Sequence, residues 1–141
     1  MEVRVKEKTN ITTKKDLAIT LKHDKPGELA KAVAAVSAAQ VNIEGFCEID
    51  GKFHCVTDDP KRAQQALEAA GFPVSQTDVL VFNAEDRPGY LANVLRAITE
   101  QEVNVITSYV LTNTRIAIGV DEPARVKDTL QELTPQTAQH R

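Results

Sequence analysis

The sequence lacks the signatures of several large protein classes. Its longest apolar runs are far too short to cross a bilayer, and the segment from Met1 to Lys8 alternates valine with charged residues instead of forming the apolar part of a signal peptide. With 42% hydrophobic residues and a net charge of -3, the composition is that of a mildly acidic globular protein, and no basic stripe favours nucleic acid or anionic lipid. We therefore expect a cytoplasmic protein that binds neither nucleic acid nor membrane.

Known catalytic motifs are also missing. No HExxH, G-x-S-x-G, Walker-type or G-x-G-x-x-G pattern occurs, and the three histidines are scattered. The only cysteines, Cys47 and Cys55, flank Asp50-Gly51, which is typical of a two-residue hairpin turn. In that register Cys47 faces His54 and Cys55 faces Phe46, so the cysteines point to opposite faces and form neither a disulfide nor a joint metal site. The sequence predicts no enzyme, no catalytic residue, no metal and no cofactor; Cys47 with His54 is the one conceivable nucleophile-base pair.

What the sequence does contain is an internal repeat of 62 residues. When Asp24 to Ile43 is laid over Asp86 to Val105, eight of twenty positions are identical, whereas unrelated segments would share about one or two. Further on, Asp59-Pro60 falls on Glu122-Pro123 at a spacing of 63 residues. A copy of about 60 residues has a thin core and gains stability by packing on a neighbour.

Each copy has the pattern of alternating strands and helices. A strand at Leu17 to Leu21 leads through a Pro-Gly turn into a helix, and a pair of strands and a second helix follow. The first helix is expected to bury Leu29, Val33 and Val36, and its repeat Leu91, Leu95 and Ile98. Residues 72–77 would close copy one and run into 79–83 as one long strand. We expect an α+β protein with antiparallel sheets, divided into residues 16–77 and 78–133, with a polar tail at 134–141.

The end of copy two differs from the end of copy one. After Leu133 no large apolar residue remains, so the second unit lacks an evident fourth strand and leaves a sheet edge open to pairing. Met1 to Lys6 alternates like an edge strand within the N-terminal segment 1–15. We hypothesise that it covers a vacant edge in its own chain or in a partner, with Lys6 to Lys15 as a polar connector or a disordered leader.

One motif stands between the first strand and the first helix of both copies. It reads Asp-(Lys/Arg)-Pro-Gly-x-Leu-Ala and is followed downstream by Val-Asn before the next strand. Free backbone N–H groups and the helix dipole attract a carboxylate, glycine permits close approach, and an aspartate and an asparagine amide could hold an ammonium group. The motif therefore suits a free amino acid. Helix capping and turn formation explain the same residues without a ligand, and Tyr90 and Tyr109 are more often packing residues.

These residues resemble the signature of ACT domains, and the chain from Asp16 to Leu133 is similar to stand-alone proteins made of two such domains. The resemblance implies two ferredoxin-like βαββαβ units, in which two helices cover one face of a four-stranded antiparallel sheet. It also implies a regulatory, non-catalytic protein that binds an amino acid at interfaces between ACT domains, most simply as a homodimer. Its output is then a partner protein such as a regulated enzyme, a change of oligomer, or binding alone. The alternative is a module that only assembles subunits without a ligand.

Carried over by position, the resemblance implies ligand-binding residues in both copies. They are Asp24, Gly27, Glu28, Leu29, Asn42 and Ile43 in copy one and Asp86, Gly89, Tyr90, Leu91, Asn104 and Val105 in copy two. Serine-binding members of the family carry asparagine where this chain has Asp24 and Asp86, so the ligand's identity stays open. Because the copies differ outside the motif, we expect two unequal sites.

Overall fold

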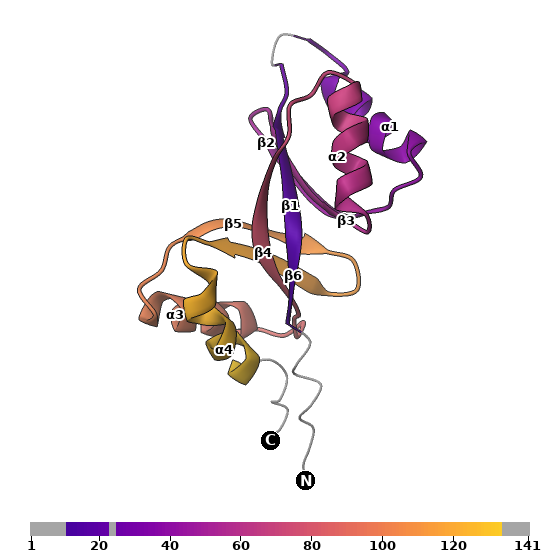
Figure 1. Ribbon diagram of the computed structural model, residues 1–141. Helices are drawn as coiled ribbons and strands as arrows, with labels where there is room; N and C mark the ends of the chain where they lie inside the picture. The colour runs from indigo at the N-terminus through magenta and orange to yellow at the C-terminus, as the bar shows by residue number, and fades with distance from the viewer. Residues whose placement is uncertain (1–10, 23–24, 134–141) are drawn as a thin grey trace. The chain divides into compact units, whose positions relative to one another are not determined.

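The structure is a computed structural model that describes residues 11–22 and 25–133. This part of the chain forms ten helices and strands. It divides into two compact units, of which the first is Lys15–Thr77 and the second combines Asp78–Arg141 with Met1–Lys14. The predicted strand at Met1 to Lys6 and the tail at 134–141 lie outside the described residues. In chain order the elements (Figure 1) are β1 Thr12–Thr20, α1 Glu28–Ala38, β2 Ile43–Ile49, β3 Lys52–Thr57, α2 Pro60–Ala69, β4 Ser75–Asn83, α3 Tyr90–Glu100, β5 Val105–Leu111, β6 Arg115–Val120 and α4 Pro123–Leu133.

The sheet of the first unit is built around β3, which pairs antiparallel with both β1 and β2. The predicted hairpin register is confirmed: Cys47 lies opposite His54, and Phe46 lies opposite Cys55. Both turn residues have positive φ, 53° at Asp50 and 82° at Gly51, as a two-residue turn between twisted strands requires. The short turn therefore fixes which residues of β2 and β3 face each other.

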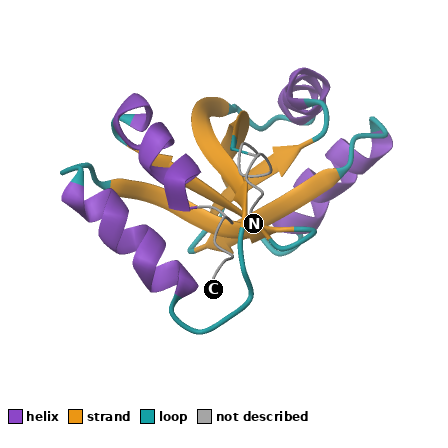
Figure 2. Ribbon diagram, turned by 90° about the horizontal axis from the view of Figure 1, so that it is seen from below, coloured by secondary structure: helices purple, strands orange, loops and turns teal. Residues whose placement is uncertain are grey.

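Helices α1 and α2 lie side by side against the strands of the first unit (Figure 1), and α3 and α4 do the same in the second. Helices and strands form separate layers in each unit (Figure 2), which confirms the predicted α+β class. In the second unit β6 pairs antiparallel with β4 and β5. One long strand does run from copy one into copy two, as predicted, because β4 is continuous over Ser75–Asn83, although it begins at Ser75 and not at Phe72.

The predicted helix stripes are wrong at several positions. In α3 the buried residues are Tyr90, Val94 and Ile98, whereas Leu91 and Leu95 are 49% and 36% exposed. One residue along a helix rotates the side chain by about 100°, so Leu91 and Leu95 lie to one side of the face that packs on the sheet. In α1 the same shift buries Ala32 and Val36 and leaves Val33 exposed, with Leu29 at the margin of the core.

The N-terminal segment enters the fold earlier than predicted. Because β1 begins at Thr12, the last part of the expected polar connector from Lys6 to Lys15 is strand. Ile11, which precedes β1, is buried in the core of the second unit together with Leu80, Phe82 and Val94. The second copy of the repeat thus draws a core residue from before the first copy.

Candidate functional site

The glycine of the repeated motif stands at the start of the first helix in both units. Gly27 and Gly89 occupy the N-cap positions of α1 and α3 with φ of 90° and 89°, a conformation that side chains rarely adopt. A Cβ atom added to either glycine would meet nothing within 4 Å. The backbone conformation, and not crowding, accounts for glycine here, and open space lies next to the turn.

Neither helix start is closed by a side chain. Among the described residues, no side chain caps α1 or α3, because glycine stands where Ser, Thr, Asp or Asn usually accepts a bond from the first turn. By contrast, α2 has Asp59 at its N-cap, whose carboxylate accepts a hydrogen bond from the Arg62 N–H at 3.2 Å. The starts of α1 and α3 are therefore the places where N–H groups and the positive end of the helix dipole are left for an anion.

The asparagines of the motif are held by aspartates that the sequence analysis did not select. The backbone N–H of Asn42 donates to Asp58 Oδ1 at 3.0 Å, and the Asp58 N–H donates back to the Asn42 carbonyl at 3.1 Å. Asn104 and Asp121 repeat this reciprocal pair at 3.1 Å in both directions. Asp58 and Asp121 are 63 residues apart, the same spacing as that of the Asp-Pro and Glu-Pro pairs beside them. This repeated spacing is the sequence signal that could have identified the two aspartates.

The two asparagine side chains differ. Asn104 Nδ2 donates to Asp121 Oδ2 at 3.2 Å. The side-chain amide of the second copy is therefore already bonded to the aspartate that holds the Asn104 backbone, a pairing called here the aspartate clamp. The Asn42 amide makes no hydrogen bond to the described residues and is exposed. The clamp therefore leaves the first copy's amide open to a ligand.

Within one unit the structure does not bring the two halves of the motif together. Gly27 begins α1 and Asn42 lies beyond its end, and a helix of 11 residues is about 16 Å long. The same holds for Gly89 and Asn104 at the two ends of α3. A free amino acid, whose charged groups lie a few ångströms apart, cannot contact both ends of the same helix.

The remaining predicted site residues have mixed environments. Asp24 lies outside the described residues, while Asp86, Leu91 and Val105 are exposed and Glu28, Leu29 and Ile43 are partly buried. The Tyr90 ring is in the core and its hydroxyl donates to the Asn83 carbonyl at 3.2 Å. Burial, with a smaller contribution from the Glu85 carboxylate, raises the pKa of Tyr90 to about 12. Tyr90 thus has a packing environment.

A second polar cluster lies in the first unit, where β1 and β3 pair. The carboxylate of Asp16 is buried and its Oδ2 lies 2.9 Å from His54 Nδ1, so this unexpected residue supplies the orienting group that the pair of Cys47 and His54 lacked in the sequence. Burial first, and then the carboxylates of Asp16 and Glu48, raise the pKa of the Cys47 thiol. A nucleophilic cysteine needs the opposite shift, so the electrostatics oppose catalysis by Cys47.

The described residues contain no group of three or more His, Cys, Asp or Glu side chains placed to hold a metal ion. In the same part of the chain, no helix combines the length and the apolar character that spanning a membrane requires.

Comparison with solved structures shows the same fold elsewhere. Protein BT0572 from Bacteroides thetaiotaomicron is 25% identical with a TM-score of 0.70, and the match covers 88% of each chain. The ligand-free regulatory subunit of aspartate kinase from Thermus thermophilus is 16% identical with a TM-score of 0.63, over 92% of this chain and 97% of that one. Aspartokinase III from E. coli, crystallised with lysine and aspartate, is 10% identical with a TM-score of 0.57, over 87% of this chain and 31% of that one.

Comparison with curated protein sequences gives no match. A family model described as an ACT domain pair matches residues 47–134, which is more than half of the chain and includes β3 and α2 of the first unit and every helix and strand from β4 to α4. This agrees with the repeat and with two units that each place a helix pair on an antiparallel sheet. The chain belongs to the ACT domain pair family.

Proposed function

We propose that this protein is a regulatory sensor that binds a free amino acid between two ACT units, without catalytic activity of its own. The carboxylate of the ligand is received at the start of α1 or α3, and its ammonium and side chain are received at the start of β2 or β5 of a neighbouring unit. The fold that the chain shares with a regulatory subunit of aspartate kinase supports the regulatory role. The site residues of this proposal are those implied by the repeated motif: Asp24, Gly27, Glu28, Leu29, Asn42 and Ile43 in the first copy and Asp86, Gly89, Tyr90, Leu91, Asn104 and Val105 in the second.

The observation that carries the proposal is the separation of the two halves of the motif. Gly27 and Asn42 lie at opposite ends of a helix about 16 Å long, yet both halves have features that a ligand needs: an uncapped helix start and a clamped asparagine. A neighbouring unit must supply the missing half. We therefore infer a homodimer in which units of different chains complete each other's sites.

The ligand-independent assembly module is the second candidate, and one observation favours it. In the second unit, large apolar side chains are exposed along α3 and β5, namely Leu91, Leu95, Val105, Ile106 and Val110, with Ile106 and Val110 at 67% and 68%. At the positions of Ile106 and Val110 the first unit has Glu44 and Glu48. An apolar surface of this kind suits association with another chain whether or not a ligand is present.

Thermal unfolding of the purified chain in the presence of each of the twenty amino acids separates the two candidates. A ligand at 100 times its dissociation constant stabilises the folded state by about 2.7 kcal/mol. One or a few amino acids raising the melting temperature supports the sensor. If none does so while light scattering shows a stable oligomer, the assembly module is correct and the sensor is wrong.

Matched variants then locate the ligand. Asn42→Ala removes the free amide of the first copy and should weaken stabilisation by that ligand, because a binding site left with unpaired polar groups loses about 1–3 kcal/mol. Gln65→Ala removes an exposed amide from α2 of the same unit and is the control. Asn104→Ala should have a smaller effect on binding, since that amide is already bonded to Asp121. Equal loss in both asparagine variants would contradict unequal sites.

We further infer that the N-terminal segment provides the second unit with the strand its own sequence lacks. Ile11 in that unit's core and the assignment of residues up to Lys14 to the second unit support this. The first unit receives Ser75 to Thr77 of β4 in the corresponding way.

A further inference from the structure

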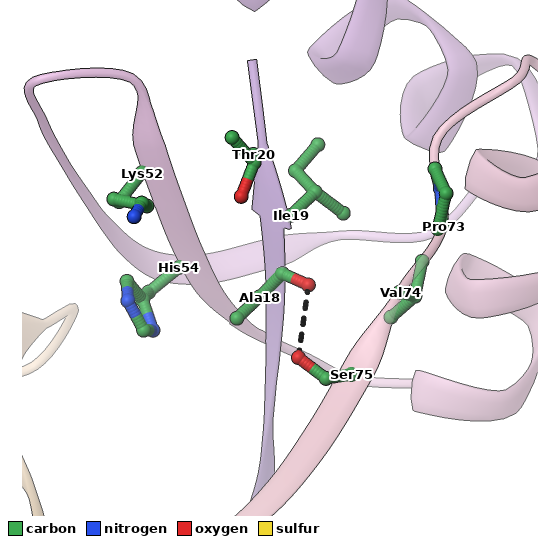
Figure 3. A pocket seen from close by; sticks show the side chains of 8 residues that line it. All are labelled: Ala18, Ile19, Thr20, Lys52, His54, Pro73, Val74 and Ser75. Atoms are coloured by element: carbon green, nitrogen blue, oxygen red, sulfur yellow. Dashed lines mark hydrogen bonds between the residues drawn. The ribbon is translucent and has the colours of Figure 1, made fainter.

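An open pocket lies on the first unit, apart from the ligand motif. Its volume is about 400 Å³, and it is lined by residues of β1, β3 and the chain leading into β4, namely Ala18, Ile19, Thr20, Lys52, His54, Pro73, Val74 and Ser75. Figure 3 shows Lys52 and His54 on one side of β1 and Pro73 to Ser75 on the other. A volume of this size suits a small molecule.

The strand register explains the shape of the pocket. Ala18 pairs with His54 and Thr20 pairs with Lys52, so these four side chains lie on one face of the sheet, away from the buried Leu17 and its neighbours. Ala18 contributes only a methyl group to the floor, and its carbonyl accepts a bond from Ser75 Oγ at 3.5 Å (Figure 3). A small residue between two larger polar ones leaves a hollow.

Three polar groups of the pocket make no hydrogen bond to the described residues, namely the Lys52 ammonium, the Thr20 hydroxyl and His54 Nε2. The Lys52 ammonium also makes no ion pair with those residues, and the His54 ring uses only Nδ1, so Nε2 is left for another partner. No carboxylate is among the residues that line the pocket, and Lys52 contributes a positive charge to it.

The second copy shows that this cluster is not a requirement of the fold. Leu17 pairs with Cys55 in the first unit as Leu80 pairs with Ile118 in the second, so Asp16 and His54 correspond to Val79 and Ala117. Those two residues are buried and apolar. A buried carboxylate is costly compared with such residues, and its presence in one copy only indicates a use beyond packing.

We propose that this pocket binds a small organic anion. The Lys52 ammonium pairs with the carboxylate or phosphate group of the ligand, the Thr20 hydroxyl donates a hydrogen bond to it, and Pro73 and Val74 contact its apolar part. The imidazolium form of His54 completes the site, with Nδ1–H donating to Asp16 and Nε2–H donating to the anion. The buried Asp16 carboxylate, bonded to His54 Nδ1, fixes the orientation of the imidazole. The site is distinct from the amino-acid motif and does not depend on the function proposed above.

The test is an NMR titration of the isotope-labelled full chain with acetate, succinate and inorganic phosphate, each compared with sodium chloride at equal ionic strength. The backbone amides of Thr20, Lys52 and Ser75 should shift in a saturable way with at least one of these probes. The probe that binds most tightly identifies the anionic group as carboxylate or phosphate.

Variants decide whether the pocket is responsible. Lys52→Gln and His54→Gln should each weaken binding at least about tenfold, because charge-assisted hydrogen bonds to an anion contribute about 1.5–3 kcal/mol. Lys61→Gln removes the same charge from the exposed surface of α2 and should leave binding unchanged, as should Asn42→Ala at the amino-acid motif. The absence of a saturable shift with every probe, or equal weakening in Lys52→Gln and Lys61→Gln, would overturn the proposal. Since Lys52 is exposed, its variant tests the site even where the His54 variant unfolds.

Discussion

The pair of Asp16 and His54 makes a quantitative prediction, because the second copy shows what the same positions look like without it. His54→Ala leaves the Asp16 carboxylate buried, with a side chain only 2% exposed and its bond to Nδ1 lost. Breaking a buried pair on one side costs about 3–5 kcal/mol. We expect the lower end, about 3 kcal/mol, since His54 is 27% exposed and Asp16 keeps a further interaction.

The double variant Asp16→Val with His54→Ala reproduces the apolar residues of the second copy, Val79 and Ala117, and leaves no charge buried. It should be more stable than His54→Ala alone by about 2 kcal/mol, because the cost of the single change comes mainly from the stranded carboxylate. For a chain of this length a loss of 3 kcal/mol lowers the melting temperature by about 10 °C.

Urea denaturation of the four proteins of this double-mutant cycle measures the coupling, with Lys52→Ala on the same sheet face as a control that should change stability by less than about 0.5 kcal/mol. Two single variants whose losses simply add in the double variant would refute the reasoning, because additivity means that Asp16 and His54 do not depend on each other.

Two further predictions concern the second unit. Ile11→Ala should lower the free energy of unfolding in urea by about 2–5 kcal/mol, because Ile11 is in the core. Ile49→Ala is the control and should be nearly neutral, since that side chain is 72% exposed. A neutral Ile11→Ala would place Ile11 outside the core. Since the pKa of Tyr90 is about 12 in the folded state and ordinarily about 10, folding favours the protonated form, so its contribution to stability is complete below pH 10 and is lost as the pH rises towards 12. Ultraviolet titration of Tyr109→Phe, which leaves Tyr90 as the only tyrosine, should give that high midpoint in the native protein and the ordinary one in denaturant.

Local sequence rules predicted those parts of the fold that local geometry decides. The hairpin register followed from Asp50-Gly51 alone, because a two-residue turn allows one pairing of its flanking strands. The stripe of α3 was misassigned because Leu91, Leu95 and Ile98 satisfy helical spacing as well as Tyr90, Val94 and Ile98 do. The two stripes differ only in which one faces the sheet, and the sequence of a single helix does not show on which side the sheet lies.

The candidate sites divide in the same way. The glycine turns before α1 and α3 were recognisable from the repeated motif, since both the residue types and their spacing recur. The bond between Asp16 and His54 joins residues 38 positions apart on paired strands, and no periodicity or spacing in the sequence predicts it. The clamps on Asn42 and Asn104 also cross between elements, although the repeat aligned their aspartates.

The position of Ile11 has a consequence for how the chain is made. A ribosome releases Ile11 early, but Leu80, Val94 and the other residues with which it packs emerge only after the whole first copy. Ile11 therefore cannot be buried in the core of the second unit until those residues have been synthesised. For the same reason, a gene fragment that begins at Asp78 encodes the repeat's second copy without one of its core side chains.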